Sequence, residues 1–234
     1  MYINYLHFNE IDSSHVYAMA HLSEFATDQW TAISAGTQRS GKGQGEKVWQ
    51  DVPGKALLLT LASPSLRLAA EAVFPRHRAA AVAALKVLQP HTPHLIQLKW
   101  PNDLYLRGKK LGGLLTEGQW AGDQCKRVVC SLGVNVLEAP VEFAHLGQDV
   151  DLELLQQDMI QAVVGAWTQD PAGQEGAYLD HWMHGGQEEW QDAQGTFWAR
   201  AVDVDAFGRI GLQRKGEESV EWYLHGQVNW LGKN

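Results

Sequence analysis

The stretch that most constrains the fold is 99–117, because it places two tight turns between short runs of strand-forming residues. The first turn, 100–103, contains a proline, which fixes its own backbone angle and keeps the residue before it out of a helix. The asparagine and aspartate of this turn also favour turns. The run 104–106 is short and β-prone, and the turn at 107–110 leads into an apolar run over 111–115. The sequence therefore predicts three adjacent strands here.

Two neighbouring glycines, Gly112 and Gly113, lie inside the third of these strands. Glycine weakens a strand, so the pair suggests that another backbone or a ligand comes close. Lys99, Lys110 and Asp103 should lie near the rims of the same strands. A solvated hairpin would explain two lysines in a turn, but two cations above a floor of glycines suit a phosphate or a carboxylate. We therefore treat this region as a candidate anion site.

Charge and length narrow the class of partner. The chain has 234 residues, and 19 Lys and Arg against 27 Asp and Glu give a net charge of −8. No run rich in Lys or Arg is present, so a broad footprint for nucleic acid is missing. An apolar fraction of 45% supports one sizeable core with a small appendage. We find no secretory signal, and no apolar run reaches the roughly 18 residues of a membrane helix.

The two cysteines, Cys125 and Cys130, lie in or beside an apolar run and lack the spacing of a zinc site. Free, buried thiols are the expected state of both. Together with the missing signal and membrane segments, they favour a reduced cytoplasm as the location of the protein.

The N-terminal part of the chain predicts a strand, a helix and a second strand. Residues 3–8 alternate as a strand does, and 29–36 form another strand. Between them, a helix should cover about 14–24, with Asp12 or Ser13 as its N-cap. Capping of this helix alone would explain a hydroxyl side chain here. For Ser13 and Ser14 considered by themselves, capping is a stronger interpretation than ligand binding.

A glycine-rich loop follows over 38–49. Gly41, Gly43 and Gly45 alternate with polar and basic residues, so the backbone amides here could wrap an anion. The loop is not a P-loop, because the later glycine-lysine-hydroxyl element is absent and no helix follows. Taken alone, such a loop is a weak signal, and a plain surface loop is the simpler interpretation.

The rest of the chain predicts an α+β core and an all-β end. Apolar runs predict buried strands, apolar stripes predict helices, and Pro75 should interrupt the chain before the first of these helices. From 185 onward, short strands separated by turn residues predict a small β-barrel. The expected ranges are 57–61, 95–98 and 127–136 for the strands, and 76–88, 151–167 and 178–182 for the helices.

Several of these motifs, in this order, resemble those of biotin protein ligases. The central motif is Lys99-Trp100-Pro101-Asn102-Asp103, followed by Lys110-Leu111-Gly112-Gly113 and Glu117. The glycine-rich loop is similar to the loop that holds the biotinoyl-adenylate in that family, and 131–136 is similar to its Gly-x-Gly-x-Asn strand. Lipoate ligases share the fold, but their corresponding segment usually reads differently. The resemblance implies a mixed sheet with helices on one side, the class II synthetase-like fold, followed by an SH3-like barrel.

The sequence departs from the family pattern at a few positions. His15 stands where asparagine is usual, Lys42 replaces an arginine, and Gly45 and Glu46 stand where Arg and Gly are common. Arginine gives a phosphate or carboxylate a bidentate fork, whereas lysine gives only a point charge. A glutamate in the loop also adds repulsion toward an acyl phosphate. We expect the activity to hold, and the grip of the loop on the intermediate is left open.

At the biotin end, the resemblance implies that Ser13, Ser14 and Gln38 bond the ureido edge of biotin and that Trp49 closes an apolar wall. Lys110 would hold the biotin carboxylate and later the phosphate side of the adenylate. The loop would close on the same anion through its lysine and its amides. The full set of expected binding residues is Ser13, Ser14, Gln38, Gly41, Lys42, Gly43, Gln44, Trp49, Asn102, Gly112, Gly113, Gly133 and Asn135.

At the nucleotide end, the resemblance implies that Lys99 and Asn102 serve the phosphates of the nucleotide. Asp103 would orient or deprotonate the incoming lysine, which must lose its proton before it attacks. The expected catalytic residues are therefore Lys110, Lys99 and Asp103. Gly133 would let the adenylate lie close to the backbone, and Asn135 either bonds the nucleotide or is a plain core or turn asparagine.

The implied activity is that of an ATP-dependent, AMP-forming biotin–protein ligase. It would activate biotin with Mg-ATP to biotinoyl-5′-AMP and transfer the biotinoyl group to a lysine of a biotin carboxyl carrier domain of a biotin-dependent carboxylase. Mg²⁺ would accompany ATP, and the ligands of the ion are unknown at this stage. We expect a catalytic domain over 1–184 and an SH3-like domain over 185–234.

The expected partners exclude nucleic acid and membranes. The ligase motifs begin at about residue 9, which leaves no room for the DNA-binding domain of some family members, so we expect no repressor role. A homodimer stays open, since family members often pair through an exposed sheet edge. Two alternative functions also stay open: a lipoate or octanoate transferase of the same fold, and a non-catalytic sensor of biotin or its adenylate.

Overall fold

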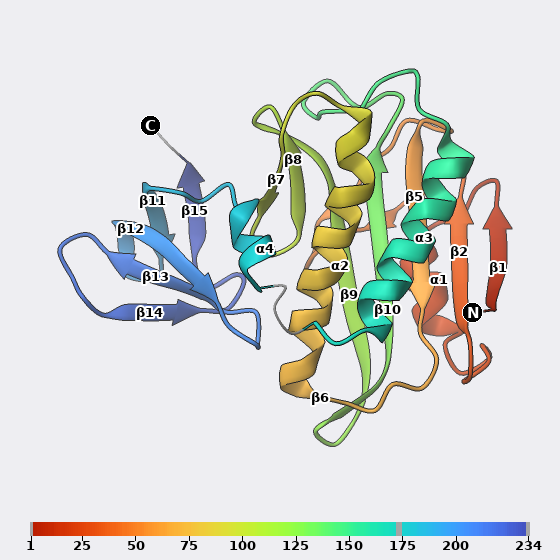
Figure 1. Ribbon diagram of the computed structural model, residues 1–234, viewed down its shortest axis with the longest axis horizontal. Coiled ribbons are helices and arrows are strands. Elements are labelled where there is room, and N and C mark those ends of the chain that lie inside the picture. The colour runs from red at the N-terminus through yellow and green to blue at the C-terminus, as the bar shows by residue number, and fades with distance from the viewer. Residues whose placement is uncertain (1, 172–174, 233–234) are drawn as a thin grey trace.

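The computed structural model describes residues 2–171 and 175–232, which form a large mixed sheet with helices and a smaller antiparallel sheet (Figure 1). In the large sheet, the strand order is β1-β2-β5-β10-β9-β8-β7, and β6 pairs with β10. Strands β1 and β2 are parallel and the other pairs are antiparallel, which confirms the mixed sheet. The strands are β1 (Ile3–Phe8), β2 (Trp30–Ala35), β5 (Ala56–Ala62), β6 (Leu68–Ala69), β7 (Ile96–Lys99), β8 (Asp103–Leu106), β9 (Lys109–Ala121) and β10 (Gln124–Asn135).

Two long helices, α2 (Val73–Leu88) and α3 (Leu152–Thr168), cover one face of this sheet (Figure 1). Side chains alternate along a strand, so Leu57, Leu59 and Leu61 of β5 all point into the core beneath these helices. Each buried leucine contributes about 2 kcal/mol by leaving water. The short helix α1 (Ser14–Ala20) packs on the opposite face, against β5 and β10.

The helix boundaries differ from the expected ones at three places, one of which is α4 (Glu175–Asp180), expected at 178–182. Helix α1 ends at Ala20, four residues before the expected end, and Ser13 is its N-cap as predicted. Helix α2 begins at Val73, so Pro75 lies in its first turn and does not interrupt the chain before it. The first-turn N–H groups of a helix have no partner within the helix, so proline is tolerated there.

The central stretch forms the three strands that the sequence predicts. Strand β8 lies between β7 and β9, so Asp103 pairs with Lys99 on one side and with Gly113 on the other. The turn between β7 and β8 contains a cis Trp100–Pro101 peptide bond. The turn between β8 and β9 takes Arg107 and Gly108 into the left-handed region, at φ 53° and 76°. These two turns place lysines and an aspartate on one face of the sheet.

The C-terminal strands form a five-stranded antiparallel sheet in the order β14-β13-β12-β11-β15, consistent with the expected SH3-like unit. It lies beside the β7 end of the large sheet (Figure 1). Trp100 Nε1 donates to the carbonyl of Gly208 at 3.0 Å, and Arg78 donates to the carbonyl of Val204 at 3.2 Å, so buried bonds join the two units. The strands are β11 (Gln187–Asp192), β12 (Gly195–Val204), β13 (Ile210–Arg214), β14 (Val220–Tyr223) and β15 (Asn229–Gly232).

Smaller elements complete the described chain. A two-stranded hairpin, β3 (Gly41–Lys42) and β4 (Val48–Trp49), orders the glycine-rich loop. The remaining helices are η1 (Ala70–Ala72), η2 (Gln89–His91) and α4 (Glu175–Asp180). Both cysteines are free and buried, as predicted. Among the described residues, none of the helices is long and apolar enough to cross a membrane.

Candidate functional site

A cleft of about 600 Å³ opens on the face of the large sheet that carries α1, and we call it the central cleft. Strands β7 to β10, the glycine-rich loop, α1 and the C-terminal sheet all contribute to its walls. The three lysines predicted to share an anion site, Lys42, Lys99 and Lys110, line it together. The other predicted residues that line it are Ser14, Gln38, Gly43, Gln44, Trp49, Asn102, Asp103, Gly113 and Gly133.

The floor of the cleft contains an ion pair over a glycine. Lys110 Nζ lies 2.6 Å from Asp103 Oδ1, and about a quarter of each side chain is exposed. A Cβ on Gly113 would lie 2.9 Å from the same Asp103 oxygen, so the missing side chain is what makes room for the pair. The sequence predicts a backbone or a ligand close to Gly113, whereas its nearest neighbour is the Asp103 side chain, followed by the carbonyl oxygen of Asn102 at 3.3 Å.

Gly112 has a different close neighbour. A Cβ there would lie 2.5 Å from the carbonyl oxygen of Gly133 on β10, so only glycine allows β9 to pack at this point. Gly112 does not line the central cleft. The close backbone that the sequence predicts is thus present at Gly112, and its role in binding stays a prediction.

Lys42 is held at the opposite wall of the cleft. Its Nζ lies 3.1 Å from Glu117 Oε1, and its backbone N–H donates to the Ser13 hydroxyl at 3.3 Å. Burial raises the pKa of Glu117, but the hydrogen bond from Lys42 and the nearby His15 outweigh burial and leave this pKa below its usual value. Glu117 is therefore an anion at neutral pH and compensates the charge of Lys42.

Lys99 lies between aromatic rings at the end of the cleft nearest the C-terminal sheet. Its ammonium is 4.9 Å from the ring centre of Trp230 and 5.3 Å from that of Tyr105, both within cation–π range. Partial burial lowers the pKa of Lys99, Asp103 raises it, and the charges of Lys47 and Lys110 lower it further. A desolvated cation among rings is suited to receive an anion.

A row of hydroxyl and amide groups lies at the other end of the cleft. Ser14 Oγ contacts Thr60 Oγ1 at 2.8 Å, and Thr60 Oγ1 contacts Ser131 Oγ at 2.7 Å. The Ser14 N–H donates to Gln38 Oε1 at 2.8 Å, which fixes the orientation of that amide. Ser131 Oγ also contacts His15 Nδ1 at 2.7 Å. Such a row can match a planar polar group of a ligand with both donors and acceptors.

An apolar wall stands next to this polar row. Trp49 packs with the buried residues Ala35, Ala56 and Leu58, as the predicted apolar wall requires. A Cβ on Gly133 would lie 2.7 Å from the Trp49 ring, so the indole fills the space that this glycine leaves. The expectation that Gly133 gives an adenylate room beside the backbone does not match this packing.

Four further predicted residues are bonded within the protein or lie outside the lining of the cleft. The Asn102 side chain donates to the carbonyl of Leu114, which makes it a brace of the turn. Ser13 caps α1 and does not line the cleft. Gly41 packs against Trp49 and Gln38, also outside the lining. Asn135 is 1% exposed and lies outside the lining, and neither polar atom of its side chain has a hydrogen-bond partner among the described residues, so its role stays a prediction.

Sequence reasoning missed cleft residues from two sources. Lys47 and Tyr105 belong to the motifs already discussed, and a lysine two residues before Trp49 in the glycine-rich loop could have been noticed. His225 and Trp230 come from the C-terminal sheet, and no local motif predicts that they line the cleft. Partial burial and the charge of Lys47 lower the pKa of His225, against an opposing effect of Asp103.

The charges of the cleft differ from those of the chain as a whole. Within the described residues, the lysines that line it are Lys42, Lys47, Lys99 and Lys110, while Asp103 and Glu117 are the carboxylates paired with them. Four positive against two negative groups leave a surplus of two on a chain of net charge −8. The cleft is therefore a positive depression suited to an anion.

Comparisons with known proteins agree with this geometry. The family model described as "Biotin/lipoate A/B protein ligase family" matches residues 9–135. The bifunctional ligase/repressor BirA of Bacillus subtilis is 29% identical over 135 residues, which are 54% of this chain and 38% of that protein. The match thus spans less than half the length of this relative.

Solved structures of similar fold cover nearly the whole chain. Biotin protein ligase from Aquifex aeolicus, in complex with biotin and ATP, has a TM-score of 0.75 at 19% identity and covers 98% of this chain and 99% of its own. Biotin acetyl coenzyme A carboxylase synthetase from Helicobacter pylori, with bound biotinylated ATP, has a TM-score of 0.64 at 20% identity and covers 94% and 100%. These likenesses confirm the predicted fold.

Proposed function

Since this chain belongs to the biotin/lipoate A/B protein ligase family, we propose that it is a biotin–protein ligase that activates biotin with ATP. The observation that carries the proposal is the meeting of Lys42, Lys99 and Lys110 in one cleft that also holds a row of polar groups. Relatives named as biotin protein ligases, including one in complex with biotin and ATP, support the choice of substrates. The polar row suits the ureido ring of biotin, which offers one carbonyl and two N–H groups.

The first step joins the biotin carboxylate to the α-phosphate of ATP. An oxygen of the carboxylate attacks phosphorus, pyrophosphate leaves, and biotinoyl-5′-AMP forms. Two anions must approach each other, so the task of the protein is to offset their repulsion and align them. Lys110 would hold the carboxylate, Lys42 would close from the loop, and Lys99 would take the nucleotide phosphates.

The second step transfers the biotinoyl group to a lysine amine of a carrier domain. The amine attacks the carbonyl carbon of the mixed anhydride, an amide forms, and AMP leaves. The attacking amine must first lose a proton, and Asp103 is the carboxylate in the cleft that could orient the amine or take this proton. The Asp103–Lys110 pair must open for this role, since the carboxylate is held by Lys110 in the structure.

Mg²⁺ would enter with ATP. Within the described residues, no group of three or more His, Cys, Asp or Glu side chains could hold a metal ion. The two carboxylates at the cleft are each paired with a lysine. These residues fit an ion that would be held by phosphate oxygens and its own waters rather than by a cage of protein carboxylates.

We also propose a boundary between residues 184 and 185. Its support is that Gly185 and Gly186 precede β11, the first strand of the C-terminal sheet. This sheet supplies Trp230 and His225 to the cleft, so both units would be needed for activity.

The test of the function is the biotinylation of a purified carrier domain. The protein is incubated with the domain, ATP and biotin, and mass spectrometry measures the mass of the domain. A gain of one biotinoyl group that requires both ATP and biotin is the expected result. Lipoate in place of biotin tests the transferase alternative, and biotin-dependent ATP–pyrophosphate exchange excludes a non-catalytic sensor. Modification with lipoate alone, or no exchange, would refute the proposal.

A further inference from the structure

His15 occupies a position in the polar row that the proposed reaction does not explain. It is 2% exposed and lies in the first turn of α1. Its Nδ1 contacts Ser131 Oγ at 2.7 Å, and its Nε2 lies 3.5 Å from Glu117 Oε1. The same Glu117 oxygen holds Lys42 at 3.1 Å. One imidazole therefore connects the hydroxyl row of the biotin end to the lysine of the glycine-rich loop.

The surroundings of His15 contain few other charges. Strand β9 presents Glu117 and the loop hairpin presents Lys42, whereas β5 and β10 present only the hydroxyls of Thr60 and Ser131. Burial lowers the pKa of His15, Glu117 opposes this effect, and Lys42 adds to it. A change in the charge of His15 is thus felt first by the Glu117–Lys42 pair.

The neutral imidazole satisfies its neighbours in one tautomer. With the proton on Nε2, the ring faces the Glu117 carboxylate with a donor, and Nδ1 accepts from the Ser131 hydroxyl. When Nδ1 gains a proton from solvent, it must donate to Ser131 Oγ, so the hydroxyls of Ser131, Thr60 and Ser14 reverse their direction. The new positive charge also competes with Lys42 for the one carboxylate oxygen that both contact.

We propose that His15 is a positioning residue that controls Lys42 through Glu117: the protonated imidazole takes over the carboxylate and frees Lys42 to grip the acyl phosphate. This inference rests on the proposed function, since the anion that Lys42 receives is the biotinoyl-adenylate. Glutamate at 117 then holds Lys42 out of the cleft centre while the anion is absent. The hold of the protein on its intermediate should therefore tighten as the pH falls through the pKa of His15.

The test first determines the pKa of His15 by NMR titration and then measures the rate at which biotinoyl-5′-AMP dissociates from the protein at pH values on both sides of it. Release from the wild type should slow by about fivefold toward the acid end, the size of one partly exposed ion pair. Release from His15→Asn should be fast and show no such slowing. His184 and His225 also line the cleft, so the difference between variant and wild type is the quantity compared.

His7→Asn is the matched control. His7 also contacts a serine hydroxyl through Nδ1, at 2.7 Å to Ser34, but it does not line the central cleft. This variant should keep the wild-type profile. A His15→Asn protein that releases the adenylate with the wild-type pH dependence would overturn the proposal.

A second measurement does not depend on any activity. NMR titration of the histidine ring signals gives the pKa of His15 in the unliganded protein. Glu117→Gln should lower this pKa, because an opposing charge is lost, and Lys42→Met should raise it, because a like charge is lost. If neither substitution moves the pKa, the link does not exist, whatever the reaction of the protein. If both move it while no biotin-dependent exchange occurs, the proposed function fails and the link stands.

Discussion

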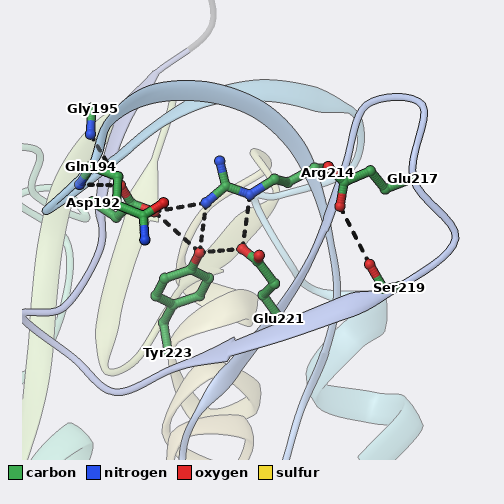
Figure 2. A network of polar contacts seen from close by, with 8 residues as sticks. All are labelled: Asp192, Gln194, Gly195, Arg214, Glu217, Ser219, Glu221 and Tyr223. Carbon is green, nitrogen blue, oxygen red and sulfur yellow. Dashed lines mark hydrogen bonds and ion pairs between the residues drawn. The ribbon is translucent and has the colours of Figure 1, made fainter.

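The C-terminal sheet and the central cleft use the same kinds of charged group in opposite ways. In the sheet, Arg214 lies between Asp192 and Glu221 at 2.8 Å from each and also donates to the Tyr223 hydroxyl, as Figure 2 shows. Its guanidinium stacks 3.7 Å above the ring of Phe197. In the cleft, Lys42 and Lys110 each have a single carboxylate partner, and 37% and 28% of their side chains are exposed.

This difference separates a charge cluster that supports the fold from one that can bind a ligand. The fork of Arg214 is surrounded by two carboxylates, a hydroxyl and a ring, so a further anion finds no room and meets negative charge. An ammonium offers three donors, and Lys42 and Lys110 use few of theirs inside the protein. Substitution of Arg214 should therefore change stability, and substitution of the cleft lysines should change activity.

The sharpest test of the comparison is Lys110→Ala. Removing the cation that would hold the biotin carboxylate should reduce biotin-dependent ATP–pyrophosphate exchange by about 100-fold or more. The free energy of unfolding should change by only about 0.5 kcal/mol, since the pair with Asp103 is partly exposed. Lys109→Ala is the control, because Lys109 binds the carbonyl of Val141 and does not line the cleft. Full exchange activity in Lys110→Ala would contradict the central assignment.

The next largest effect, on stability and on biotin binding, is expected where Gly133 packs tightly against Trp49 of the apolar wall. In Gly133→Ala, the new methyl group would meet the Trp49 ring at 2.7 Å, and overpacking of this kind costs about 2 kcal/mol. We expect weaker binding of biotin as well, because the displaced indole forms the wall. Calorimetry with biotin and thermal unfolding measure the two effects.

The double variant Gly133→Ala with Trp49→Ala shows whether the contact is the cause. Removing the indole relieves the clash, so the alanine at 133 should then cost little in unfolding free energy. Costs that simply add would mean that Gly133 serves a purpose other than making room for Trp49.

Much of the fold and the lysine cluster could be predicted because both depend on patterns of residues that are close together in the sequence. The turn residues at 100–103 and 107–110 set three strands side by side, and this alone brings Lys99, Asp103 and Lys110 to one face. Alternation predicted β1, and an apolar run predicted β5. The prediction that Pro75 interrupts the chain was wrong, because the effect of a proline depends on its place in a helix, and the sequence does not reveal where the helix begins.

What the sequence could not provide is the result of contacts between distant segments. Gly112 and Gly133 both belong to recognisable motifs, but the motifs do not say why glycine is needed. Gly112 makes room for a carbonyl oxygen of the neighbouring strand, and Gly133 makes room for an indole 84 residues earlier in the chain. Asn102 is bonded to Leu114 across a turn. The contributions of Trp230 and His225 depend on how the C-terminal sheet docks, and no motif encodes that.

The counterpart test in the sheet is Arg214→Leu. It should cost about 1 kcal/mol of unfolding free energy, kept low by exposure to water, and leave the exchange activity of the folded protein unchanged. Burial raises the pKa of Asp192, but hydrogen bonds from Gln194, Arg214 and Tyr223 together outweigh it and leave the pKa below its usual value. The hydrogen bonds of Glu221 with Tyr223 and Arg214 lower the pKa of that group too. Both carboxylates are thus paired with Arg214 at neutral pH.

The pH dependence of this stability term follows from those two lowered pKa values. Pairing with Arg214 contributes fully above the ordinary pKa values of 3.8 and 4.5, and the contribution is lost as the pH falls through the lowered values of the folded state. Urea unfolding of wild type and Arg214→Leu should therefore differ at pH 7 and converge in strong acid. A loss of activity in the variant at neutral pH would break the separation between the two regions.

The smallest expected effect is that of Lys42→Arg, which tests whether the side chain at position 42 can bind a further anion besides Glu117. A guanidinium could bind Glu117 and an acyl phosphate with different donors, where the ammonium offers a point charge. Adenylate dissociation should stay equal or slow by about threefold, as one added charged hydrogen bond of a partly exposed group would give. Lys86→Arg, on helix α2 and outside the cleft, is the control. Faster release from Lys42→Arg would contradict the place that we assign to residue 42 beside the acyl phosphate.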